Sequence, residues 1–203
     1  MKTNLSNTET FDENQSVEVI REMLKVSQKK LKNDGILFIV WGWLMFYNYT
    51  SNYLIEKLIF TYRLQRAINI IGYPLAILAV AFSIYYILKE RKKVQTYIGI
   101  SLRYVWLSLL ACLSLTNMIM FNILHRAFFE LQHPVFMLFI AFAIVITGGI
   151  MRYKLVVFGG IAFGILAYIA SYFSLQEQML FDAAAWLIAF IIPGHILFAN
   201  RKN

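Results

Sequence analysis

The sequence has few charged residues and almost no cysteine. Of its 203 residues, 15% are charged and 60% are hydrophobic, whereas about a quarter of the residues in an ordinary soluble domain are charged. The single cysteine, Cys112, excludes a disulfide within the chain and a cysteine-rich metal site. A soluble protein of this composition would expose large apolar patches, so the composition predicts a protein that resides in a lipid bilayer.

Motifs of membrane enzymes are also missing from the sequence. It contains no HExxH metal pair, no GxSxG nucleophile elbow, no phosphate-binding P-loop and no pair of acids on one apolar run. The nearest approach lies at 125–133, where His125, Glu130 and His133 could form a metal or acid/base group. This segment loosely resembles the His-x4-Asp element of glycerolipid acyltransferases, with Glu130 in place of the aspartate. We expect no catalytic residue, no metal site and no cofactor, and therefore no enzyme.

Long apolar runs separated by charged interruptions make up most of the chain. A helix that crosses a hydrocarbon core of about 30 Å needs roughly 20 apolar residues. Runs of this kind lie at 35–55, 67–88, 98–122, 134–151, 155–174 and 179–198. The sequence therefore predicts an all-α, polytopic integral membrane protein with a bundle of six transmembrane helices over residues 35–198. If the basic segment 152–154 were not a turn, the number of spans would fall to five.

Lysine and arginine are distributed unevenly between the two sides that these spans define. Fourteen of the nineteen flank the spans on the side of the termini, four lie on the other side, and Arg103 falls just inside the third span. Positive residues in short loops are retained in the cytoplasm. We therefore predict that both termini, including a tail at 199–203, are cytoplasmic. The net charge of +8 has the same origin, so we expect no nucleic-acid partner.

The segment before the first span combines a polar tail with an amphipathic pattern. Residues 1–15 are predicted to be a disordered tail. Residues 16–34 are predicted to form an amphipathic helix, with Val17, Ile20 and Leu24 near helical spacing and lysines toward its end. We expect this helix to lie at the cytoplasmic interface, against anionic lipid headgroups. Docking of a cytoplasmic protein partner is the alternative.

Polar residues inside the spans lie toward their ends. No charge lies at the centre of a span, which argues against ion-coupled pumps of familiar design. Residues in the outer halves either line an outward-facing polar cavity or only join helices: Asn48, Asn52, Asn69, Asn117, Asn122 and Asp182. Near the cytoplasmic side, Arg103 and His195 are candidates for an anion or lipid contact, although a histidine in this position is more often a packing residue. Pro193 predicts a kink in the last span.

Small residues recur at steps of four, three and four in two spans. The two stripes are Gly72, Ala76, Ala79 and Ser83 in the second span, and Gly160, Gly164, Ala167 and Ser171 in the fifth. Small residues let helix backbones approach closely in lipid. We therefore predict that both stripes are helix-packing faces, either within the bundle or in a homodimer.

Two short motifs suggest a family. The segment Trp-Gly-Trp at 41–43 and the segment Ile-Ile-Pro-Gly-His at 191–195, with the basic amphipathic start, resemble a group of small bacterial six-span membrane proteins that has no assigned activity. The resemblance implies a six-helix architecture and the bacterial inner (plasma) membrane. Two functions remain open: a non-catalytic accessory or regulatory membrane component, or a small transporter or lipid-binding carrier.

Overall fold

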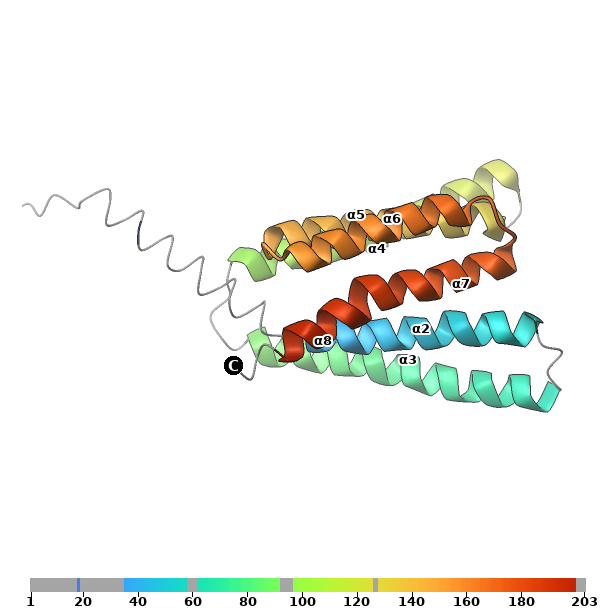
Figure 1. Cartoon of the computed structure of the whole chain (residues 1–203), viewed down its shortest axis with the longest axis horizontal. Helices are drawn as coiled ribbons and strands as arrows, with labels where there is room; N and C mark the ends of the chain where they lie inside the picture. Colours follow the sequence, from blue (N-terminus) through green and yellow to red (C-terminus); the bar gives the residue numbers. More distant parts are fainter. Residues whose placement is uncertain (1–17, 19–34, 58–61, 92–96, 126–127, 200–203) are drawn as a thin grey trace, which may run out of the picture.

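A computed structural model of the chain describes residues 18, 35–57, 62–91, 97–125 and 128–199 (Figure 1). The helices are α2 (Ile36–Lys57), α3 (Tyr62–Arg91), α4 (Tyr97–Leu124), α5 (Phe129–Ile150), α6 (Lys154–Ala170), α7 (Leu175–Trp186), the π-helical turn η1 (Leu187–Ile191) and α8 (Ile192–Ala199). The last three follow one another without a break, so they form one long helix. The described residues contain no strand, and the all-α prediction is confirmed. The predicted tails at 1–15 and 200–203, and all of 16–34 except Glu18, lie outside the described residues.

Three of these helices are long and apolar enough to cross a membrane: Gly99–Leu124, Phe129–Ile150 and Leu175–Ala199. Shorter apolar stretches lie at Ile70–Tyr86 and Lys154–Ala170. The helix α2 is not among the candidates, because its second half carries tyrosine, asparagine, threonine and serine at 47–53. The chain is thus a helical protein with several candidate membrane spans, and these differ in apolar character more than the sequence pattern suggested.

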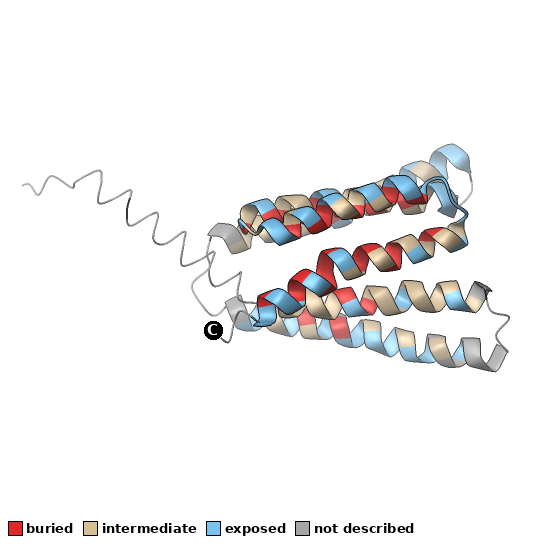
Figure 2. Cartoon of the chain, viewed as in Figure 1, coloured by how far each residue is buried: buried red, intermediate tan, exposed pale blue. Residues whose placement is uncertain are grey.

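The long C-terminal helix lies at the centre of the bundle. In Figure 1, α7 runs between a layer that contains α5 and α6 and a layer that contains α2 and α3. It contacts both α2 and α6, whereas α3 packs chiefly on α2 and α4 chiefly on α5. Figure 2 shows buried residues concentrated along α7, η1 and α8. The core is formed by residues such as Met137, Ile144, Phe163, Trp186 and Phe190.

The outlying helix α4 contributes little to this core. In the most apolar stretch of α4, 6% of the residues are buried. In the most apolar stretch of Leu175–Ala199, 56% are buried. Large apolar side chains such as Leu107, Leu115 and Phe121 are exposed on it. A surface of this kind suits hydrocarbon and would be a liability in water.

The segment 151–153 separates α5 from α6, as the basic turn predicted. The Tyr153 N–H donates to the Gly148 carbonyl at 2.9 Å, and the Arg152 N–H donates to the Gly149 carbonyl at 3.1 Å. These two bonds define a Schellman motif, which ends a helix with one residue in the left-handed region. That residue is Arg152, with φ of 50°.

Pro193 disturbs the long helix through the turn that precedes it. Proline has no N–H, and its ring displaces the carbonyl four residues earlier. In η1 the Ile192 N–H donates to the Leu187 carbonyl, five residues back. The chain therefore accommodates the proline with one widened π-turn and continues as α8.

Glycines bring α2 into direct backbone contact with this turn. A Cβ atom on Gly42 would lie 2.8 Å from Ile191 Cγ1 and 3.0 Å from Phe190 Cβ, and one on Gly194 would lie 3.0 Å from the Ile39 nitrogen. At distances this short, a side chain at position 42 or 194 would force the neighbouring atoms to shift. The two sequence motifs at 41–43 and 191–195 are therefore packed against each other.

The two small-residue stripes face helices of the same chain. A Cβ on Gly160 would lie 2.7 Å from Val145 Cγ2, and one on Gly164 would lie 3.6 Å from Ala141 Cβ, so this part of α6 packs on α5. Ala167 is buried, whereas Ser171 is exposed at the end of the stripe. On α3, Ala79 and Ser83 are buried, and Gly72 and Ala76 are half-buried. The Trp41 indole N–H donates to the Ser83 hydroxyl at 3.0 Å, which joins α2 to α3.

Candidate polar site at the acidic end of the bundle

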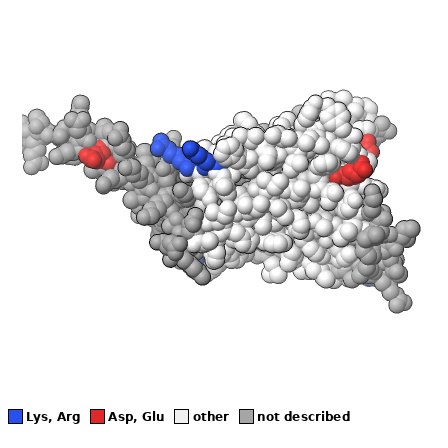
Figure 3. Space-filling model, in the orientation of Figure 1, with Lys and Arg blue, Asp and Glu red and all other residues white. Residues whose placement is uncertain are grey.

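Arg152 and Lys154 lie at one end of the bundle, and Glu130 and Glu177 lie at the other. Figure 3 shows basic residues at the α5–α6 turn, where Arg152 and Lys154 are exposed, and acidic residues at the other end. The acidic residues there are Glu130, at the start of α5, and Glu177, at the start of α7. We call this second end, formed by the α4–α5 and α6–α7 connections, the acidic end. It is the end that the lysine and arginine count predicts to be extracytoplasmic.

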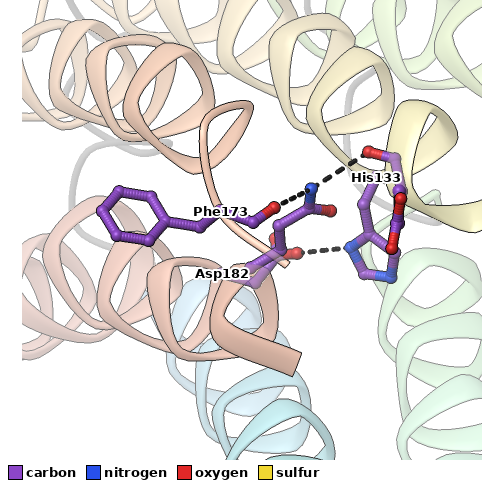
Figure 4. Close-up of polar contacts among 5 residues, drawn as sticks. His133, Phe173 and Asp182 are labelled. Carbon is purple, nitrogen blue, oxygen red and sulfur yellow. Dashed lines mark hydrogen bonds and ion pairs between the residues drawn. The ribbon is translucent and has the colours of Figure 1, made fainter. Parts of the chain in front are cut away.

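A buried carboxylate lies just inside the acidic end. Asp182 on α7 is 1% exposed, and its Oδ2 is 2.7 Å from His133 Nδ1 on α5 (Figure 4). The start of α7 is fixed by a capping box, in which Ser174 and Glu177 satisfy the first free N–H groups of the helix. Asp182 therefore lies two helical turns into α7, on the side that faces α5. Among the described residues, His133 is the one side chain that hydrogen-bonds the Asp182 carboxylate.

Gln178 holds the start of α5 to the α6–α7 turn. Its Nε2 donates to the Glu130 carbonyl and to the Phe173 carbonyl, at 3.0 Å each (Figure 4). Both acceptors are backbone oxygens, so the two donor positions of the amide are used and its oxygen must point elsewhere. Gln178 is itself 1% exposed, which makes this amide a buried clamp between three parts of the chain.

Two acceptor atoms of this cluster have no hydrogen-bond partner. They are Asp182 Oδ1 and Gln178 Oε1, both fully buried. Residues four apart on a helix share one face, so both side chains project to the same side of α7. The ring of Tyr49, on α2, stands edge-on to His133 with 5.7 Å between centroids. The cluster thus offers a carboxylate, an imidazole and an amide, a set suited to binding hydrogen-bond donors or a positive charge.

The predicted outer asparagines do not join this cluster. Asn52 Nδ2 donates to Asn48 Oδ1 at 2.9 Å within α2, and Asn117 Oδ1 accepts from Gln132 Nε2 at 3.3 Å. Asn122 is exposed near the end of α4. The side chain of Asn69 lies outside the described residues. In the described part of the chain, no hydrogen bond joins an asparagine to Asp182.

The candidates at the cytoplasmic side are also separate in the structure. His195 Nδ1 is 2.8 Å from the Ile191 carbonyl, and the ring is edge-on to Trp43 with 6.4 Å between centroids. Arg103 is half-buried on α4. Over the described ranges no hydrogen bond links Arg103 to His195. An anion or lipid contact that uses both side chains stays a prediction.

Sequence reasoning found Asp182 but missed its partners. It grouped His133 with His125 and Glu130 in one loop, whereas the structure places His133 inside α5 and directs it to Asp182. Glu130 contributes only its backbone carbonyl, which accepts a hydrogen bond from Gln178. His125 follows the last residue of α4, in the left-handed region with φ of 51°. The usable signal was the spacing of Gln178 and Asp182, which lie four residues apart and therefore on one face of the helix. Within the described ranges no three His, Cys, Asp or Glu side chains are placed to hold a metal.

No family model matches the sequence, and neither curated proteins nor solved structures match the chain.

Proposed function

We propose that the chain is a multi-pass protein of the bacterial inner membrane that crosses the bilayer six times, with both termini in the cytoplasm. Three helices have the length and composition of spans. The others run alongside them and match the bilayer in length. α2 has 22 residues and α6 has 17, which at 1.5 Å per residue correspond to about 33 Å and about 26 Å. A hydrocarbon core of about 30 Å accepts both lengths. The polar half of α2 is tolerated because that helix packs against α7, inside the bundle.

Within that membrane, we propose that the chain acts as a non-catalytic accessory or regulatory component that contacts another membrane protein through α4. The supporting observation is that α4 is nearly unburied although it is one of the three strongest candidate spans. Its exposed side chains include Asn122, and an amide facing lipid gains from a partner helix that offers hydrogen bonds. A helix that adds little to its own core is available for a second protein.

Site-directed photocrosslinking tests this role. A photoreactive amino acid at Leu115, which is 58% exposed on α4, should yield a discrete protein adduct in native membranes. The matched control is Leu109, on the same helix and 7% exposed, which should yield none. If both positions give only lipid adducts, α4 is a lipid-facing helix and the accessory role is wrong.

A reporter fusion tests the topology. A reporter that is active only in the cytoplasm should work when fused after residue 203 and fail when inserted at 126–127, in the α4–α5 connection. The reverse pattern, or equal activity at both sites, would contradict six crossings with cytoplasmic termini.

A small carrier is the second candidate, favoured by the buried acceptors of Asp182 and Gln178 near the acidic end. For a carrier, the Asp182→Asn variant in proteoliposomes should lose uptake of its substrate while the photocrosslink at Leu115 is unaffected. For an accessory protein, wild-type proteoliposomes should show no uptake above protein-free vesicles.

A further inference from the structure

We propose that Asp182 and Gln178 form a binding site for a small monovalent cation, either an alkali ion or a protonated primary amine. The site lies between α5 and α7 at the acidic end. It is independent of the proposed function, because either an accessory protein or a carrier could hold such an ion.

Two buried acceptor atoms at the acidic end have no hydrogen-bond partner among the described residues. Asp182 Oδ1 and Gln178 Oε1 are buried without a partner, and each of the two side chains is 1% exposed. A buried polar atom without a partner is costly, and more so in a bilayer, where no bulk water can replace it. A cation or a hydrogen-bond donor that contacts both oxygens would remove the free-energy cost of leaving them unpaired.

Neither side chain can rotate so that its free oxygen finds a hydrogen-bond donor. Asp182 Oδ2 is held by His133, and Gln178 Nε2 is held by two backbone carbonyls, of Glu130 and Phe173 (Figure 4). If the amide of Gln178 flipped, its oxygen would face those two carbonyl oxygens, which is repulsive. The two unpartnered oxygens are therefore fixed in place by the fold.

The charge of the site favours a ligand with one positive charge. An oxygen-only acceptor set that includes a carboxylate repels anions and attracts cations. The described basic residues Arg152 and Lys154 lie at the far end of the bundle (Figure 3), and His133 contacts only one of the two Asp182 oxygens, Oδ2. One carboxylate balances one positive charge. Divalent cations usually take several carboxylates and more oxygen ligands, which the described cluster does not supply.

The position of the site near the end of the bundle gives an ion a short route of entry. Glu130 and Phe173 are exposed residues at the end of the bundle, and the His133 side chain is 23% exposed. The site is therefore buried but lies close to the surface that we expect to face the outside.

Thermal unfolding of the full-length protein in detergent tests the proposal. The protein is kept in N-methylglucamine chloride, whose cation is too large for the site, and NaCl, KCl or methylammonium chloride replaces it at constant ionic strength. At least one of the three small cations should raise Tm in a saturable way, by roughly 2–4 °C at about fivefold excess over its Kd. Comparison of the salts separates an alkali ion from an amine.

Variants locate the effect. Asp182→Asn should abolish the rise in Tm, whereas Glu177→Gln, which removes a half-buried acid on the same helix, should keep it. In case Asp182→Asn does not fold, equilibrium binding of radioactive sodium, rubidium and methylammonium to the wild type provides a second measurement.

Three results would overturn the proposal. The first is that no small cation shifts Tm relative to N-methylglucamine, which is the expectation if a buried water satisfies both oxygens. The second is an equal shift in wild type and Asp182→Asn. The third is that the wild type binds none of the three radioactive cations saturably.

Discussion

Replacing Gly42 with alanine should destabilise the bundle far more than the same change at Gly149. The added Cβ at position 42 would meet Ile191 Cγ1 at 2.8 Å, Phe190 Cβ at 3.0 Å and the Ile191 nitrogen at 3.1 Å. Two of these atoms belong to the backbone or lie directly on it, so η1 and α2 must move apart. At Gly149, also within a helix, the added atom would meet nothing within 4 Å.

The paired design isolates the packing energy. Both variants make the same chemical change in a helix, so the gain of about 1 kcal/mol in helix propensity applies to each. Overpacking a close contact costs about 1–3 kcal/mol. For a chain of this size, 1 kcal/mol shifts Tm by roughly 2–4 °C. We therefore expect Gly42→Ala to unfold about 2–12 °C below Gly149→Ala.

Tryptophan fluorescence during heating in detergent, with size-exclusion chromatography of heated samples, measures this difference. Equal Tm values for the two variants would mean that α2 does not approach the π-turn as closely as described. A lower Tm for Gly149→Ala would contradict the assignment of packing roles to these two glycines altogether.

Three further changes probe other contacts, each measured by the same unfolding assay. Gly160→Ala should lower Tm more than Gly164→Ala, because its Cβ would lie 2.7 Å from Val145 Cγ2 while that of position 164 meets Ala141 Cβ at 3.6 Å; similar values would refute the α5–α6 packing. Ser83→Ala removes the acceptor of the Trp41 indole and should cost about 0.6 kcal/mol, typical of hydrogen bonds between membrane helices; no loss would show that Trp41 finds another partner. Arg152→Gly relieves a left-handed backbone and should stabilise the protein by about 1 kcal/mol, whereas a lower Tm would contradict the Schellman turn.

The sequence pattern predicted the helices well and the candidate site only in part. Apolar runs and basic interruptions are local features, and they indicated the helical elements and the turn at Arg152 correctly. Asp182 was also identified, because an acid inside an apolar run is conspicuous. The asparagines predicted to lie at a similar depth form other hydrogen bonds in the described structure. Asn48 bonds to Asn52, and Asn117 bonds to Gln132.

By itself, the sequence determined that this chain is helical and suited to a membrane, because the length of an apolar run and the spacing of charges act within one helix. Only the tertiary structure decided which helices meet. His133 and Asp182 are 49 residues apart, and Gly42 meets Ile191 from the opposite end of the chain. Contacts of this kind depend on the packing of whole helices, which no local periodicity records. For the same reason, small-residue stripes indicate a packing face without identifying the partner, and the buried acceptors became visible only once α5 and α7 were placed together.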